Sequence, residues 1–276
     1  MTVQTYETII RDFSIDGIDV KFADWRHPAQ GEIVFDIGMF NFIKSFIHRG
    51  DVVVDVGPHV GVETLLYGLA AGPTGTVYAF EPNPYVFAPL KKTCELNRQT
   101  TNIVPLNLAV TQNNGPCVFH YSDEGYCNGG FASETDAGVG AAGHRIPIEV
   151  EGVNLFGWFE KNAREHMTKI KFLKTDTEGY DLKVLVSSLG LIHMSNPIIQ
   201  SELFTFLSRT EVENQLKFFD LHRYQTYFMP DQKQSALGSC NIYNLKDKSF
   251  TANDIDLAMR VCRGGNIFSV PKELLW

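Results

Sequence analysis

Apolar residues between positions 51 and 110 follow two alternating spacings. Short, largely β-branched runs are typical of strands that are buried on both faces, and they occur at 51–56, 76–80 and 103–106. Between these runs, apolar positions recur at helical spacing. Gly72-Pro73 ends the first expected helix, and Asn83-Pro84 can cap and open the second. The order strand, helix, strand, helix, strand with short connections predicts a parallel sheet with right-handed crossovers.

The flanking parts of the chain extend this pattern. Residues 1–35 contain short alternating runs, and Asp36 is placed to cap a helix that ends near Gly50. Thr210-x-x-Glu213 has the form of a capping box that opens a later helix. The remaining expected strands are 146–150, 170–174, 197–202, 223–229, 239–245 and 266–270, and the remaining helices lie near 155–159, 180–189 (ending at Gly190), 210–219 and 254–262. We therefore expect an α/β, doubly wound sheet forming one domain over residues 51–276, with an N-terminal extension over residues 1–50.

Residues 122–145 interrupt the alternation of strands and helices. Six glycines fall within this segment, which has few large apolar residues. The segment is predicted to be a loop, and loops longer than about 12–15 residues are usually functional or disordered. It is expected to be either a lid over an acceptor site or the tip of a hairpin.

Composition and charge narrow the functional classes. The chain has 276 residues, with 24 Lys and Arg against 32 Asp and Glu, and a formal net charge of −8. This balance, without a basic run, disfavours a nucleic-acid partner, because such proteins depend on basic surfaces. No apolar run approaches the roughly 18 residues of a membrane span, and residues 1–11 lack the apolar core of a signal peptide. The five cysteines are scattered without a CxxC pair, which predicts no zinc site or disulfide framework and favours a reducing, cytoplasmic location. The oligomeric state is left open.

Candidate chemistry gathers where the expected parallel strands end. Ligands of open parallel sheets bind at the carboxyl ends of the strands. Gly57, just after the first strand, lets the backbone approach a ligand, and the helix after Gly61 offers free N–H groups. Glu81 ends the second strand, where a carboxylate can accept hydrogen bonds from ribose hydroxyls. The G-x-G-x-x-G pattern of dinucleotide sites is missing, because His59 occupies the position of the second glycine. A nucleoside without phosphates, such as S-adenosylmethionine (SAM), fits better.

Several stretches of the chain resemble the FkbM-type family of SAM-dependent methyltransferases. They are VVVDVGPHVG (52–61), GTVYAFEPNPYVFAPLKKTCELN (75–97), VPLNLAV (104–110), FLKTDTEGYDLKVL (172–185) and PIIQSEL (197–203). The resemblance implies a Rossmann-like, mostly parallel sheet of seven strands. It also implies SAM as the cofactor and O-methylation of sugar or natural-product hydroxyls. The Pro58-His59 pair departs from the family pattern, which usually has a small residue and Asn after Gly57.

Residue by residue, the resemblance implies two groups of site residues. The cofactor contacts are expected at Asp55, Gly57, His59, Gly61, Glu81, Asn83, Asn107, Leu108 and Ala109. The methionine end of SAM would lie near Asp55, Gly57 and Gly61, the ribose near Glu81, and the adenine near the last three residues of this set. Catalysis is expected at Asp176 and Glu178, beside the site of methyl transfer.

The chemistry of the catalytic pair has several alternatives. Asp176 is a candidate general base for a hydroxyl acceptor, with capping of the following turn as the alternative. Glu178 is either part of this chemistry or a hydrogen-bonding strut. Together with Glu202, the pair could instead bind a divalent cation, although we expect no metal. His59, His120 and His144 are alternative bases, and Cys127 is assigned no chemistry.

The sequence thus predicts an enzyme that transfers a methyl group from SAM to a hydroxyl of a small molecule. Two alternatives remain open. The Pro58-His59 departure motivates a non-catalytic SAM-fold binding or scaffold protein, and N-methylation uses the same cofactor.

Overall fold

The computed structural model describes residues 5–122, 129–131, 144–229, 249–250 and 265–274. Its centre is a sheet of order β13-β12-β14-β11-β10-β3-β4-β5. The strands are β3 (Val52–Val56), β4 (Thr76–Phe80), β5 (Ile103–Leu106), β10 (Ile170–Thr175), β11 (Ile198–Leu203), β12 (Tyr224–Met229), β13 (Ser249–Phe250) and β14 (Gly265–Pro271). β3, β4, β5, β10 and β11 pair in parallel, and β14 runs antiparallel between β11 and β12. The expected seven-stranded, mostly parallel sheet is confirmed, and the two-residue β13 is added at one edge.

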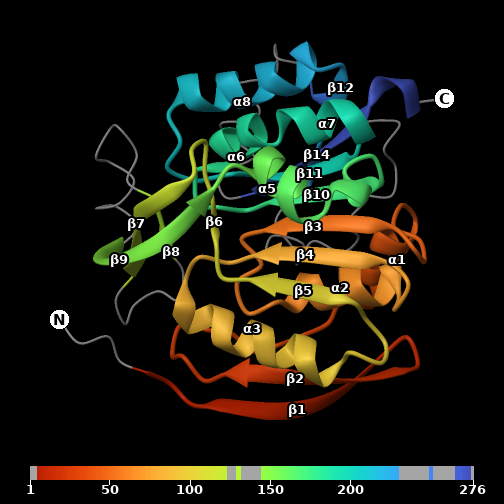
Figure 1. The fold of residues 1–276 in the computed structure, drawn as a ribbon. Helices are drawn as coiled ribbons and strands as arrows, with labels where there is room; N and C mark the ends of the chain where they lie inside the picture. Colours follow the sequence, from red (N-terminus) through yellow and green to blue (C-terminus); the bar gives the residue numbers. More distant parts are fainter. Residues whose placement is uncertain (1–4, 123–128, 132–143, 230–248, 251–264, 275–276) are drawn as a thin grey trace.

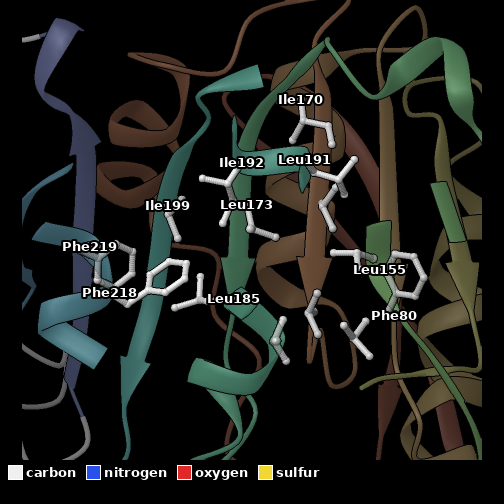
Figure 2. Close-up of a cluster of buried hydrophobic side chains, with 14 of the residues drawn as sticks. Phe80, Leu155, Ile170, Leu173, Leu185, Leu191, Ile192, Ile199, Phe218 and Phe219 are labelled. Carbon is white, nitrogen blue, oxygen red and sulfur yellow. The ribbon is translucent and has the colours of Figure 1, made fainter. Parts of the chain in front are cut away.

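Helices cover both faces of this sheet (Figure 1). They are α1 (Ile37–Lys44), α2 (Val62–Ala71), α3 (Pro84–Leu96), α5 (Leu155–Asn162), α6 (Asp181–Ser187), α7 (Leu189–Ser195) and α8 (Arg209–Leu221), with 3₁₀ turns at Arg164–His166 and Lys272–Leu274. The pleat of β3 explains the two layers, because successive side chains point to opposite faces. Val52, Val54 and Val56 join the core shared with α5 to α8, whereas Val53 joins the core shared with α1 and α2. Figure 2 shows the first core, in which Leu173 and Ile199 of the sheet pack with the helical residues.

Two smaller sheets flank the central one. The first is a hairpin of β1 (Thr8–Ile15) and β2 (Ile18–Trp25), which confirms the expected β-rich N-terminal segment. The second has the order β6-β9-β7-β8 and contains β6 (Ala109–Val110), β7 (Gly115–Ser122), β8 (Gly129–Gly130) and β9 (His144–Val153). The N-terminal hairpin packs on α3, where Asn97 donates to the Lys21 carbonyl and accepts from its N–H. The boundary proposed at residue 50 remains a prediction.

Three local expectations were wrong in detail. The helix expected over 180–189 is two helices, and Gly190 lies inside α7 rather than at a helix end. A Cβ on Gly190 would lie 2.3 Å from Cδ2 of Phe156, so this glycine permits close packing of α7 against α5. The capping box is Ser208 with Glu211, two residues before the expected pair. Helix α1 ends at Lys44, well before Gly50.

The expected loop over 122–145 is only partly described. Ser122 belongs to β7, Gly129 and Gly130 form β8, and His144 begins β9, so these positions are strand rather than loop. The long ladder between β7 and β9 extends the backbone pairing into the predicted loop. The other positions of that segment lie outside the described residues, as do the strand expected at 239–245 and the helix expected at 254–262. Among the described helices, none combines the length and the apolar character needed to cross a bilayer.

Candidate functional site

A cavity of about 430 Å³ opens at the carboxyl ends of the central strands. This volume falls within the roughly 300–1,000 Å³ range of small-molecule sites. Chain connections run from β3 to β4 on one side and from β10 to β11 on the other, so the sheet order reverses between β3 and β10. Such a switch point leaves a crevice outside the strand ends. The fold therefore places a ligand-sized cavity where the sequence pattern expected one.

Seven of the predicted site residues line this cavity. They are Gly57, His59, Glu81, Asn83, Ala109, Asp176 and Glu178. They come from the ends of different strands, and the first and last of them, Gly57 and Glu178, are 121 positions apart along the chain. Both predicted catalytic residues and five of the nine predicted cofactor residues thus share one cavity.

Glu81 is held rigidly at the end of β4. Its Oε2 accepts the N–H of His59 at 3.0 Å, and its Oε1 accepts the N–H of Asn83 at 2.8 Å. The side chain is 5% exposed, and burial raises the pKa of this carboxyl to about 8 despite the two donors. Each oxygen accepts one backbone bond and keeps acceptor capacity for a ligand hydroxyl.

Asn83 follows Glu81 closely in the chain, and within the described residues its side-chain amide has one bonded atom and one unbonded atom. Its Oδ1 accepts the N–H of Tyr85 and caps α3, as the sequence predicted. Its Nδ2 is buried and has no hydrogen-bond partner among the described residues. Buried polar groups are normally hydrogen-bonded. A donor left over in the wall of a cavity is what a ligand oxygen would satisfy.

The two glycines after β3 have a packing reason that the sequence did not reveal. Gly57 has φ +80°, and a Cβ there would lie 1.9 Å from the carbonyl oxygen of Asp176. Gly61 has φ +90° and opens α2, and a Cβ there would lie 2.5 Å from Cδ1 of Leu90. The expectation that Gly57 makes room for a ligand is therefore incomplete, because protein backbone occupies the space above its Cα. Gly61 does not line the cavity.

Three further predicted cofactor residues are not part of the cavity wall. Asp55 is fully buried and accepts a hydrogen bond from Oγ1 of Thr64 at 2.6 Å. Asn107 donates from Nδ2 to the carbonyls of Glu81 and Pro82 and so fixes the turn that carries Glu81. Leu108 packs against the core that is shared with α5 to α8. None of the three is among the cavity-lining residues, and their contact with the cofactor remains a prediction.

Lys174 was missed as a site residue, although it is the first residue of the K-x-D-x-E-G stretch. Its ammonium lies 3.7 Å from Asp55, 3.7 Å from Glu63 and 3.4 Å from Asp176, and it donates to the carbonyl of Gly57 at 3.1 Å. Burial alone would lower the pKa of Lys174, but the three carboxylates outweigh it and raise the pKa. Lys174 is therefore a buried cation that ties the ends of β3 and β10 together.

An acidic group follows β10. Asp176 has a 35% exposed side chain that faces Lys174, and Glu178 adopts a left-handed backbone with φ +54°. Asp181 is buried and accepts from Thr175 and Thr177, and burial raises the pKa of its carboxyl to about 6. Burial and the neighbouring acids raise the pKa of Glu202 well above its usual value. Among the described residues, no three His, Cys, Asp or Glu side chains have the arrangement of a metal site.

The candidate histidine bases are separated by the fold. His59 lines the cavity, whereas His120 lies on β7 and does not. His144 begins β9, but its side chain lies outside the described part of the structure, as does Cys127. Of these groups, His59 is the one whose side chain can be assigned to the cavity wall.

Two parts of the wall had no signal in the sequence pattern. The first is an aromatic wall of Phe119, Phe131 and Tyr180, with ring centroids 5.6 Å and 4.7 Å apart. The second is the segment Ala29–Gly31, which comes from the N-terminal extension. Both parts come together through tertiary contacts, so no local motif could mark them.

The family model described as the methyltransferase FkbM domain matches residues 55–229. No protein of curated function matches the chain. Among solved structures, a methyltransferase FkbM from Methylobacillus flagellatus KT is 12% identical, with a TM-score of 0.47, 80% of this chain covered and 43% of that one. A putative rRNA-methylase from Clostridium thermocellum is 12% identical, with a TM-score of 0.44 and coverage of 87% and 97%. A putative SAM-dependent methyltransferase from Streptococcus mutans is 10% identical, with a TM-score of 0.46 and coverage of 97% and 56%. The chain thus spans less than half of the first of these proteins, and similarities this low carry no argument about substrate.

Proposed function

The chain belongs to the FkbM methyltransferase family, and from that premise we propose that it transfers the methyl group of SAM to a hydroxyl of a small, uncharged ring compound. One observation carries this proposal. A single cavity is lined by Glu81 and Asn83 on one side and by Asp176 and the aromatic wall on the other. The first pair suits a nucleoside, and the second set suits an acceptor that must be oriented and deprotonated.

The residues present fit the cofactor. Glu81 keeps acceptor capacity for two ribose hydroxyls, and Asn83 Nδ2 lacks a partner among the described residues. Ala109 is fully buried in the wall at the start of β6, beside the expected position of the adenine. When bound, SAM supplies a methyl group that is already activated for transfer. The protein's task is then to hold the acceptor in line, which can contribute several kcal/mol to the rate.

Asp176 is the proposed base. It lies at the end of β10 in the cavity wall, and its partly exposed carboxylate can reach a ligand. Its carboxylate forms an ion pair with the Lys174 ammonium at 3.4 Å, and a carboxylate oxygen in this position can accept the proton of an acceptor hydroxyl. General-base assistance of this kind contributes about 10²–10⁴-fold.

The charge of the cavity supports an uncharged acceptor. Four carboxyl side chains line it (Glu63, Glu81, Asp176 and Glu178) against one ammonium, that of Lys174, which is already engaged by Gly57 and three acids. Phosphate groups would meet acidic side chains instead of the Lys and Arg contacts on which nucleic-acid binding depends. The aromatic wall offers flat apolar faces for a sugar or polyketide-type ring.

The proposal is tested by methyl transfer from labelled SAM to panels of acceptors. We expect label on hydroxyls of neutral sugars or polyketides, and none on amines or RNA. Label on RNA, with binding that weakens steeply with salt, would refute the acceptor class. Label on an amine would favour N-methylation. Tight SAM binding without transfer to any acceptor in the panel would favour the non-catalytic binding protein.

A further inference from the structure

The segment Ala29–Gly31 reaches the cavity from outside the matched family domain. It precedes residue 55, where that match begins, yet all three residues line the cavity. Nothing in the FkbM-like stretches predicts a contribution from this segment. The site is therefore completed by the N-terminal extension.

The turn that carries this segment is fixed by a buried histidine. His27 is 3% exposed, its carbonyl accepts the N–H of Gln30 at 2.9 Å, and its Nδ1 accepts the N–H of Ala29 at 3.0 Å. Burial lowers the pKa of His27, which keeps the ring neutral and the Nδ1 lone pair available. The rings of Tyr6 and Trp25 pack on it at centroid distances of 4.5 Å and 4.6 Å. The position of Gln30 is thus set by packing.

The same aromatic group places the turn next to the loop after β3. The Trp25 ring lies 6.3 Å from the ring of His59, and His59 stands between Gly57 and Gly61. Gln30 consequently lies in the part of the cavity wall next to β3. The wall continues at Glu81, which follows β4, and at Ala109, which begins β6.

Gln30 presents an acceptor that lacks a donor. Its Oε1 is buried and has no hydrogen-bond partner within the described residues. A buried carbonyl oxygen of this kind is unfavourable unless a donor reaches it. Because the oxygen belongs to a cavity-lining residue, a bound ligand can supply that donor.

We propose that Gln30 Oε1 accepts a hydrogen bond from the α-ammonium group of SAM, an inference that rests on the proposed function. SAM carries hydrogen-bond donors on its adenine, its ribose and its ammonium. Glu81 takes the ribose hydroxyls and the adenine is expected near Ala109, so the ammonium is the donor left for the β3 end. The carboxylate of Glu63 also belongs to the cavity wall and suits the same positive charge.

The test compares two nucleosides by calorimetry. S-adenosylhomocysteine carries the ammonium, whereas 5′-methylthioadenosine shares the nucleoside and lacks the amino-acid end. Gln30→Met keeps the length of the side chain and removes the acceptor. It should weaken S-adenosylhomocysteine about 10-fold or more, as for a hydrogen bond to a charged group, and leave 5′-methylthioadenosine within about twofold. Gln30→Glu keeps an oxygen acceptor and should retain the affinity for S-adenosylhomocysteine. Gln112→Met, an exposed glutamine outside the cavity wall, is the matched control.

Each other result overturns the inference in a distinct way. Equal weakening of both nucleosides by Gln30→Met means that Gln30 shapes the cavity without contacting the ammonium. Unchanged binding of both means that Gln30 does not touch the cofactor, and that its partner is the acceptor or water. A wild-type protein that binds neither nucleoside refutes the proposed function, and this inference with it.

Discussion

Replacing Lys174 with Met should destabilise the protein strongly, because three carboxylates lose their shared cation. Met has a similar length and adds no new charge. Glu63 and Asp176 are 34% and 35% exposed at the side chain, so water can solvate them after the change. The Asp55 side chain, in contrast, is 0% exposed, so water cannot solvate its carboxylate after the change. Most of the loss should therefore arise from Asp55.

The size of the effect follows from that buried carboxylate. Removing one partner of a buried ion pair costs about 3–5 kcal/mol, out of the about 5–15 kcal/mol by which a domain is stable. For a chain of this size that corresponds to a fall in Tm of about 6–20 °C. Urea unfolding followed by circular dichroism measures the change in the free energy of unfolding. Lys171→Met is the matched control, because Lys171 lies on the same strand and is exposed, and it should change the free energy by less than about 0.5 kcal/mol.

The loss of stability in Lys174→Met should become smaller as the pH falls. Burial already raises the pKa of Asp55, and Lys174 opposes that shift. Without Lys174 the folded-state pKa rises further above the unfolded value, so the folded protein binds a proton more tightly than the unfolded chain. Stability lost at pH 8 should therefore return as the pH falls through the raised pKa, and the gap to wild type should narrow. A loss below about 1 kcal/mol at neutral pH, or a gap that does not change with pH, would refute this account of Lys174.

The remaining predictions concern the cavity wall. Glu81→Ala removes the proposed ribose acceptor and should weaken SAM about 10–150-fold, measured by calorimetry; unchanged affinity would remove Glu81 from the site. Gly57→Ala should cost several kcal/mol in urea unfolding, since the new Cβ would meet the Asp176 carbonyl, whereas Gly17→Ala has a similar φ of +78° and nothing within 4 Å, so its cost should be about 1 kcal/mol. Similar losses for the two glycine variants would contradict the close approach. Asp176→Asn should keep SAM affinity and lower turnover about 10²-fold or more once an acceptor is known; full activity would leave Asp176 a structural role.

Local patterns located most of the central sheet correctly. The apolar runs at 76–80 and 103–106 became β4 and β5 with the predicted bounds. Asn83 caps α3 as predicted, since a cap depends on the few residues that follow it. Local rules failed where neighbours from elsewhere decide: Gly190 has the appearance of a helix end, but it sits inside α7 because Phe156 packs on it.

The sequence by itself determined the alternation of strands and helices over 51–110, the placement of Glu81 at a strand end and the family-like motifs around it. These depend on residue spacing within one unit of strand, helix and strand, which is short in sequence. Tertiary structure alone decided that Lys174 turns inward to bond Gly57, a residue 117 positions away. It also brought Gln30 and the aromatic wall into the cavity and left Asp55 and Asn107 out of its lining, bonded to Thr64 and to the Glu81 carbonyl. The physical reason is that burial and pairing of polar groups depend on which distant segments the folded sheet brings together, and no local pattern encodes that meeting.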